Sequence, residues 1–443
     1  MRLMPVVKRT DRMNFIAKLN MSGVTRFLLY VLIFFQPFNH FNSFREISFY
    51  ALFAIFLGRM FKGEVKNIAF NDKTIIAISM LIGWSLLVSV SGPFPWESLN
   101  AVRKNLFKEV IIFLVIIMEF KSFRDIKPLF WVVVASFTAV TIASIIENIA
   151  KDWELFSTLT PAVSWRATST YFFANYADNG TFYLPFIAAW LVSVKEMSWK
   201  KWIGAGTLMV GCVLIYIYNA RTHLLTVFFV VFIIMLLAKK YKLVAVFVIT
   251  AVLSISIVAT SKYEGSSRYK TLLSTDTYTT DKGLTNRLGL WLVVVEIIKE
   301  RPLIGYGYGW KKLASIIQEK DSDEFWGEYP PSARNYYVDD AQLMYGRVNP
   351  HNLPLQIIFE IGLIGFSIFL WLWGTVFWKI FKCARTGNDP QARKFIISSI
   401  GVIIAFVMVN ITNSLWQECY GNMIFLFMAI VFVIHRETKA DFL

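Results

Sequence analysis

The feature that most constrains this chain is a series of apolar stretches, each close to the length needed to cross a lipid bilayer. About 20 apolar residues in a helix span a hydrocarbon core of ~30 Å. Only a structure that satisfies every backbone hydrogen bond internally can remain in that core. The pattern predicts an all-α polytopic membrane protein with about 12 transmembrane helices. The stretches lie at about 22–38, 42–61, 74–91, 104–119, 129–148, 181–195, 202–219, 222–238, 241–260, 352–377, 395–413 and 417–435.

Composition and charge support this class. Hydrophobic residues make up 56% of the 443-residue chain and charged residues 17%, against about 25% charged in soluble domains. Three cysteines are too few for a disulfide scaffold. A net charge of +15 could indicate nucleic acid, but Lys and Arg gather in alternate loops, as at Lys239, Lys240 and Lys242. That distribution follows the positive-inside rule, so it predicts cytoplasmic termini and requires no nucleic-acid partner.

Three regions follow from this topology. Residues 1–260 are expected to hold transmembrane helices 1–9 after a cytoplasmic N-terminus, without a cleavable signal peptide. Residues 261–351 form a large external loop domain with short helices, and residues 352–443 hold helices 10–12 and a cytoplasmic C-terminus. Within the loop domain, the stretch from Arg287 to Lys299 has a helical pattern but is too short to span. We expect an amphipathic helix on the outer face, ended by the Arg301-Pro302 step.

Basic residues on the external side need a reason other than topology. Arg221 begins an expected span after an almost absent external turn, and Arg287 opens the expected amphipathic helix. An arginine there can snorkel to lipid headgroups, or it can bind a lipid-linked phosphate in a bidentate manner. Arg166, in an external loop, and Lys108, at an outward helix start, are weaker candidates for substrate binding, with headgroup anchoring as the alternative for Lys108.

Histidine is rare in the chain, with four residues in total. His351 stands where the large external loop enters the next span, and a neutral imidazole there could accept a proton from a sugar hydroxyl. A loop-capping role is the alternative. His223 follows Arg221 by two residues, so we expect it to face elsewhere.

The sequence offers little support for a metal or nucleotide site. Asp321-Ser322-Asp323 has the spacing of a cation-binding pair but lies in a charged run that is more simply a solvated loop. The chain has no HExxH, Walker A or GxSxG motif, which argues against an ATP-driven pump and a membrane protease. Few acidic residues lie centrally in the spans, which argues against an ion-coupled transporter. We therefore predict no metal and no cofactor.

Three motifs resemble those of the bacterial O-antigen ligase and O-antigen polymerase superfamily. The first is Asn219-Ala220-Arg221-Thr222-His223, and the second is Thr285-Asn286-Arg287-Leu288-Gly289 followed by Pro302-Leu303-Ile304-Gly305-Tyr306-Gly307. The third is His351-Asn352 followed by Glu360-Ile361-Gly362-Leu363-Ile364-Gly365. A weaker match runs from Arg166 to Pro185. The chain looks most like the ligase that joins O-antigen to lipid A–core.

The resemblance implies a membrane glycosyltransferase of the GT-C-like type in the bacterial inner membrane, with its active site facing the periplasm. It implies transfer of a glycan from undecaprenyl diphosphate to lipid A–core, without nucleotide sugar or metal and with inversion at the anomeric carbon. Arg221 and Arg287 match arginines assigned to the diphosphate, and His351 matches the catalytic histidine. A polymerase or protein O-oligosaccharyltransferase of the superfamily remains open, as does a lipid-linked sugar transporter or flippase from another class.

Overall fold

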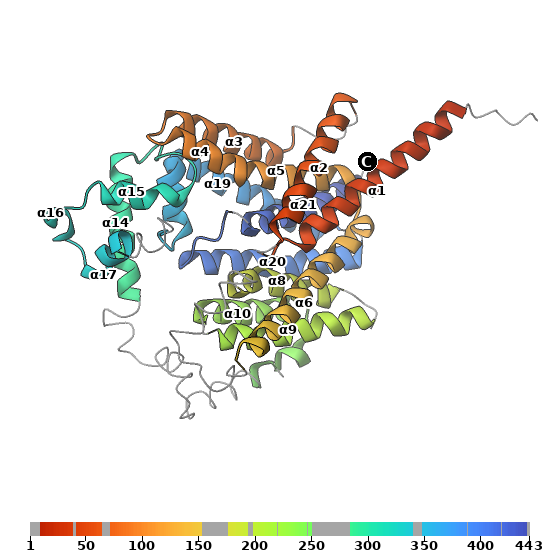
Figure 1. Cartoon of the computed structure of the whole chain (residues 1–443). Helices are drawn as coiled ribbons and strands as arrows, with labels where there is room; N and C mark the ends of the chain where they lie inside the picture. The colour runs from red at the N-terminus through yellow and green to blue at the C-terminus, as the bar shows by residue number, and fades with distance from the viewer. Residues whose placement is uncertain are drawn as a thin grey trace, which may run out of the picture.

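Helices form all the regular structure in the part of the chain that the structure describes (Figure 1). The structure is a computed structural model. Its described residues are 9–38, 41–63, 71–152, 176–193, 198–218, 220–245, 247–249, 284–339, 348–387, 389–417 and 419–440.

The expected apolar stretches correspond to helices, apart from 241–260, most of which lies outside the described residues. The helices are α1 (Arg9–Phe34), α2 (Asn42–Phe61), α3 (Lys73–Ser91), α5 (Leu106–Glu119), α6 (Phe123–Asp152), α8 (Tyr176–Ser193), α9 (Trp199–Ile217), α10 (Arg221–Leu237), α19 (Leu353–Thr386), α20 (Pro390–Ile411) and α21 (Cys419–Ala440).

Five helices in the described part are long and apolar enough to cross a membrane: Lys73–Ser91, Phe123–Ile146, Leu353–Thr386, Pro390–Ile411 and Tyr420–Thr438. The chain is therefore a multi-pass membrane protein, whereas the full count of twelve spans stays a prediction. The expected span at 104–119 corresponds to α5, whose 14 residues reach only about 21 Å at 1.5 Å per residue. The short helix α4 (Pro95–Lys104) precedes it, and Asn105 separates the two helices.

The centre of the bundle is made by the last three long helices. Helix α20 packs against α8, α10 and α19, while α21 packs against α5 and α19. Apolar side chains fill these contacts, including the fully buried Phe186, Phe395 and Phe425. Helices α8, α10 and α19 are thereby held against α20.

Residues 284–339, called the external region because the sequence predicts them to lie outside the membrane, pack around a small core of their own and are more ordered than a plain loop. Helix α14 (Leu284–Glu300) is followed by η5 (Trp310–Lys312), α15 (Leu313–Gln318), α16 (Asp323–Trp326), α17 (Pro331–Arg334) and the π-helical turn η6 (Asn335–Asp339). Figure 1 shows the helices from α14 to α17 together at one end of the bundle, with the C-terminus toward the other. Helix α14 buries Leu290, Val293, Val294 and Ile297, spaced as one helical face. Its Leu288, Leu292 and Val295 are exposed, so the helix is apolar on both faces.

The segment that follows α14 in the external region enters a break in α19 and is held there by backbone hydrogen bonds. Gly362, within α19, has φ 69° and ψ −179°, which breaks the regular helix. The amide nitrogens of Tyr306 and Leu363 donate to the carbonyls of Phe359 and Pro302 at 2.9 and 2.8 Å respectively. A Cβ at Gly362 would lie 2.1 Å from the Leu303 carbonyl oxygen. Only glycine allows both this conformation and this approach, so the Pro-Leu-Ile-Gly and Glu-Ile-Gly motifs meet in space.

Buried polar groups strengthen the same junction. The Glu360 carboxylate, 1% exposed, accepts hydrogen bonds from the Gly309 amide at 2.8 Å and from Gln356 and Gln417. Lys312 donates to the Ser98 hydroxyl at 3.0 Å and to the Gly309 carbonyl at 2.6 Å. Burial lowers the pKa of Lys312 to about 8, although Glu360 opposes the shift. Helix α4, the segment after α14, and α19 are therefore held together.

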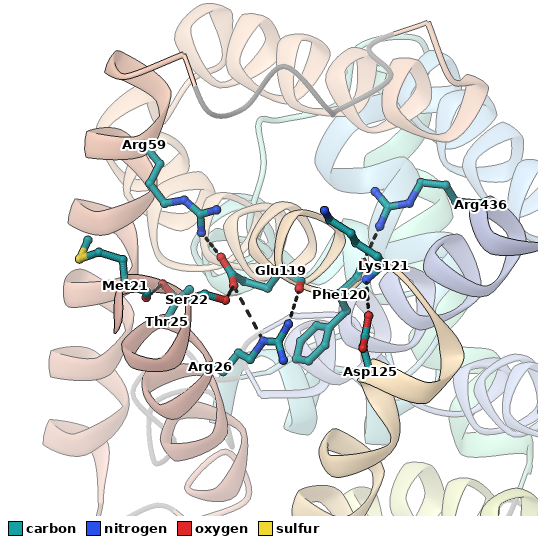
Figure 2. Close-up of polar contacts among 10 residues, drawn as sticks. All are labelled: Met21, Ser22, Thr25, Arg26, Arg59, Glu119, Phe120, Lys121, Asp125 and Arg436. Carbon is teal, nitrogen blue, oxygen red and sulfur yellow. Dashed lines mark hydrogen bonds and ion pairs between the residues drawn. The ribbon is translucent and has the colours of Figure 1, made fainter. Parts of the chain in front are cut away.

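Arginines gather at the opposite end of the bundle, around the end of α5 (Figure 2). The buried Glu119 carboxylate pairs with Arg59 of α2 and accepts a hydrogen bond from Ser22 of α1 at 2.6 Å. Arg26 donates to the Glu119 carbonyl at 3.0 Å, and Arg436 of α21 donates to the Ile117 carbonyl at 2.9 Å. Cations at a helix C-terminus satisfy its open carbonyls and its dipole. This cluster joins α1, α2, α5 and α21.

Candidate functional site

The candidate site lies where several helix ends meet next to α14. Arg221 is the first residue of α10, Asp178 lies in the first turn of α8, and His351 precedes the first residue of α19. Because α8 and α19 both pack against α20, as α10 does, their ends are brought to one place. Arg287, near the start of α14, reaches the same place from the external region.

The electrostatic contacts show that the three principal candidates converge. Burial, and then the nearby Arg221 guanidinium, lower the pKa of Arg287. Burial, and then Arg287, lower the pKa of His351 to about 4, from an ordinary value near 6.5. Arg221 therefore acts on Arg287, and Arg287 acts on His351. The imidazole is neutral at pH 7 and faces a concentration of positive charge.

The backbone around His351 is held in an uncommon conformation. His351 has φ 48°, in the left-handed region that costs an ordinary residue about 1–2 kcal/mol. Its amide donates to the Asn349 side-chain oxygen at 2.8 Å, and Asn352 caps α19 by accepting from the Leu355 amide at 3.0 Å. Trp291 of α14 donates to the Pro350 carbonyl at 3.0 Å. Such a conformation persists where the surroundings fix it, so the direction of the imidazole is determined by these contacts.

Tyr336 contacts the imidazole from the external region. Its hydroxyl lies 3.0 Å from His351 Nε2 and donates to the Asn349 carbonyl at 3.1 Å. The Asn349 amide donates to the same hydroxyl at 3.2 Å. Tyr336 thus ties η6 to the segment that carries His351.

A second polar group adjoins His351, and sequence reasoning missed it. His223 Nε2 lies 2.5 Å from the Asp178 carboxylate, and the Asn413 amide nitrogen lies 3.4 Å from the same His223 nitrogen. Asp178 and Asn413 also act on His351, since both raise its pKa against the effects of burial and Arg287. The expectation that His223 faces elsewhere is therefore wrong, because α8 and the α20–α21 connection bring partners to it. In the sequence, this group is marked only by the fact that Asp178 and Asn413 are polar residues near the ends of apolar stretches.

The weaker candidates do not join this group in the described residues. Lys108 pairs with Glu46 of α2 and lies 5.5 Å from the centre of the Phe49 ring. Arg166 lies outside the described residues, so its predicted role remains a prediction. Asp321 accepts hydrogen bonds from Trp326 at 2.7 Å and from Arg334 at 3.3 Å, contacts that hold the external region together.

The fold and the site define an all-helical, multi-pass membrane protein with a cationic centre at the end that the external region covers. Residues 205–370 match the family model described as "O-Antigen ligase". This range includes Arg221, Arg287 and His351.

Curated relatives extend the match. A "Putative polysaccharide ligase" of Rickettsia typhi is 26% identical over 262 residues, 57% of this chain and 57% of the relative. A protein of the same description from Rickettsia conorii is 26% identical over 266 residues, 57% of this chain and 56% of the relative. A third, from Rickettsia felis, is 26% identical over 194 residues, 42% and 40% of the two chains. The matches span about half the length of these relatives. Together with the family model they confirm the resemblance to the O-antigen ligase superfamily.

Proposed function

We propose that this protein transfers a glycan from undecaprenyl diphosphate to lipid A–core oligosaccharide at the periplasmic face of the bacterial inner membrane. The coarser statement, that it resembles polysaccharide ligases, rests on the family model and the relatives. Beyond that statement, we propose the identity of the donor and the acceptor and the roles of Arg221, Arg287 and His351.

The observation that carries the proposal is the convergence of Arg221, Arg287 and His351 from three separate elements. Two guanidiniums form a site of concentrated positive charge, and a diphosphate matches it because each arginine can bind phosphate oxygens through two N–H groups. A neutral imidazole beside them can accept a proton at physiological pH.

The proposed reaction is a single displacement. The acceptor hydroxyl oxygen forms a bond to the anomeric carbon, and the bond from that carbon to the diphosphate oxygen breaks. The hydroxyl proton passes to His351, and undecaprenyl diphosphate leaves with the bonding electron pair. Attack opposite the leaving group inverts the anomeric configuration.

The side chains supply this chemistry through charge and proton transfer. Arg221 and Arg287 stabilise the negative charge that grows on the leaving diphosphate, and loss of one such donor costs about 10²–10³ in rate. His351 as general base contributes about 10²–10⁴. Because the guanidiniums are placed to neutralise the diphosphate, we propose a reaction that is independent of metal.

A reconstituted assay tests the proposal. Purified protein in lipid nanodiscs is mixed with undecaprenyl-diphosphate-linked glycan and lipid A–core without nucleotide, and joined product is measured with and without excess chelator. We expect transfer in both conditions and a loss of at least about 10²-fold in Arg221→Ala, Arg287→Ala and His351→Ala.

The control is Glu296→Gln, which removes a charge from the exposed Glu296–Lys299 pair on α14 and should leave transfer unchanged. Near-normal transfer by any of the three alanine variants removes that residue from the mechanism. Product formed on a second donor molecule in place of lipid A–core would assign a polymerase, and loss of activity with chelator would contradict metal independence.

A further inference from the structure

The Tyr336 hydroxyl makes three polar contacts with the short segment that carries His351. Its oxygen lies 3.0 Å from His351 Nε2, 3.1 Å from the Asn349 carbonyl oxygen and 3.2 Å from the Asn349 amide nitrogen. The His351 amide in turn donates to the Asn349 side chain at 2.8 Å. One hydroxyl therefore contacts both the imidazole and the backbone from which the imidazole extends.

Counting hydrogen atoms assigns a direction to each of these contacts. A tyrosine hydroxyl has one hydrogen to donate and two lone pairs that accept. The Asn349 amide can only donate and the Asn349 carbonyl can only accept, so the amide uses one lone pair and the carbonyl takes the hydroxyl hydrogen. The second lone pair is left for His351 Nε2, which must then carry a hydrogen.

The opposite assignment leaves an unfavourable contact. If the hydroxyl hydrogen pointed to His351 Nε2, the oxygens of Tyr336 and of the Asn349 carbonyl would lie 3.1 Å apart with no hydrogen between them. Only a hydrogen on Nε2 makes all three contacts hydrogen bonds. Because a neutral imidazole carries one N–H and one bare nitrogen, the free lone pair is on Nδ1.

Helix α14 holds both partners of this contact in place. Tyr336 lies in the π-helical turn η6, and the hydroxyl of the next residue, the fully buried Tyr337, donates to the Leu290 carbonyl of α14 at 3.4 Å. Trp291 of the same helix donates at 3.0 Å to the carbonyl of the residue before His351. The turn and the His351 segment are thus each fixed to α14, so the hydroxyl stays opposite Nε2.

We propose that Tyr336 is a positioning residue that fixes the His351 tautomer with hydrogen on Nε2, so that Nδ1 is the nitrogen that takes the proton of the attacking hydroxyl. This inference rests on the proposed function, in which His351 is the base. The O–H bond of the acceptor breaks as the Nδ1–H bond forms, and the electron pair left on oxygen forms the bond to the anomeric carbon.

The same contact favours proton uptake. Nε2 keeps its hydrogen throughout the step, and its hydrogen bond to the Tyr336 oxygen is stronger when the ring is charged, because charge-assisted hydrogen bonds are stronger than neutral ones. Tyr336 touches neither substrate in this scheme and acts only through His351.

NMR of protein isotope-labelled at histidine in carbon and nitrogen tests the tautomer without requiring transfer. The chain has four histidines, and the signals missing from His351→Ala belong to His351. Nδ1 is identified by its bond to Cγ and Nε2 by its bond to Cδ2, and each nitrogen shift shows whether that atom carries hydrogen. At pH 7 we expect hydrogen on Nε2 and a lone pair on Nδ1. A wild-type ring with hydrogen on Nδ1 overturns the proposal.

Tyr336→Phe removes the hydroxyl and keeps the aromatic ring. We expect both tautomers of His351 to appear and kcat to fall about 10-fold, part of the roughly 10²–10⁴ that a general base supplies. KM for the lipid-linked donor should stay near the wild-type value, because the two arginines are unchanged. A purely structural defect would lower the amount of active enzyme without changing the tautomer.

The matched control is Tyr337→Phe, one position along the same turn. It removes a hydroxyl that donates to α14 and should keep the wild-type tautomer and kcat. An equal change of tautomer and kcat in this control would overturn the assignment to the Tyr336 hydroxyl.

The outcomes separate this inference from the proposed function. If His351→Ala is inactive but Tyr336→Phe keeps the wild-type tautomer and kcat, the role of Tyr336 is overturned and the proposed function stands. If His351→Ala transfers normally, the proposed base is wrong, and the role of Nδ1 is overturned with it. The wild-type spectrum decides the tautomer even if Tyr336→Phe fails to fold.

Discussion

At the residue scale, His351 combines a strained backbone conformation with a strongly lowered pKa. Burial and the Arg287 guanidinium favour the neutral imidazole and bring its pKa to about 4. At pH 5.5 an ordinary histidine, with a pKa near 6.5, is mostly protonated, whereas this one remains a proton acceptor. Under the proposed function, the cationic surroundings that would bind the diphosphate also keep His351 unprotonated and able to act as the base.

This leads to a prediction about pH. The free enzyme's kcat/KM should stay high between pH 7 and about 5 and fall as the pH approaches 4, because protonated His351 cannot accept a proton. Initial rates of glycan transfer from pH 4 to 8 measure this, with samples returned to pH 7 to show that the enzyme survived. If kcat/KM instead falls around pH 6.5, the pKa of His351 in the free enzyme is not lowered as its surroundings predict.

Part of the candidate site could be selected from the sequence. Arg221 and Arg287 could be selected as basic residues at helix ends expected on the external side, and His351 as a rare histidine at the start of an expected span. Asp178, His223 and Asn413 could not, since their significance depends on contacts between residues 45 and 190 positions apart. Hydropathy shows where a helix begins but not which other helix ends beside it.

At the element scale, the interruption of α19 is the feature that the hydropathy pattern concealed. The apolar stretch at about 352–377 predicts one span, yet Gly362 breaks the helix and admits the segment after α14. A glycine in an apolar run has several structural explanations. The reason for a glycine at position 362 becomes clear only from the structure, in which the Leu303 carbonyl lies against it.

Two glycines of α19 provide a matched pair for testing this junction. Gly362→Ala places a methyl group 2.1 Å from the Leu303 carbonyl oxygen at a positive φ, so we expect a loss of at least several kcal/mol in stability and little folded protein. Gly374→Ala meets nothing within 4 Å and should be neutral or stabilising by up to about 1 kcal/mol.

Thermal unfolding in detergent and the yield of monodisperse protein measure both variants. A Gly362→Ala variant as stable as wild type would show that the segment does not enter α19 as described.

At the scale of the whole molecule, the two ends of the bundle differ in chemistry. Glu119 with Arg26, Arg59 and Arg436 closes one end (Figure 2). The opposite end carries Arg287, His351 and the external helices. Sequence reasoning anticipated an all-helical membrane protein, and the described part of the chain agrees with that class, whereas the placement of residues 261–351 outside the membrane stays a prediction. Sequence reasoning did not anticipate the second core, because that core is assembled from short helices without a long apolar period.

Because the Glu119 arginine cluster and the external region lie at opposite ends of the bundle, we expect them on opposite sides of the membrane, with the external region outside the cytoplasm. In a background with Cys212, Cys383 and Cys419 changed to serine, Lys299→Cys on α14 should react with a membrane-impermeant maleimide in intact spheroplasts. Lys62→Cys, exposed just after α2, should react only after the membrane is permeabilised. Labelling by gel shift measures both, and the reverse pattern would place the candidate site in the cytoplasm.

The way the external region enters α19 limits how such proteins can be recombined. A chimera that transplants residues 284–339 alone would carry a foreign Pro302–Gly309 segment to a native α19, and the glycine-dependent backbone contacts would have to match by chance. Under the proposed function, a donor or acceptor preference encoded in residues 284–339 therefore could not be exchanged as an independent module. A successful exchange has to move both partners of the junction together, so the two are expected to diverge in step as the protein evolves.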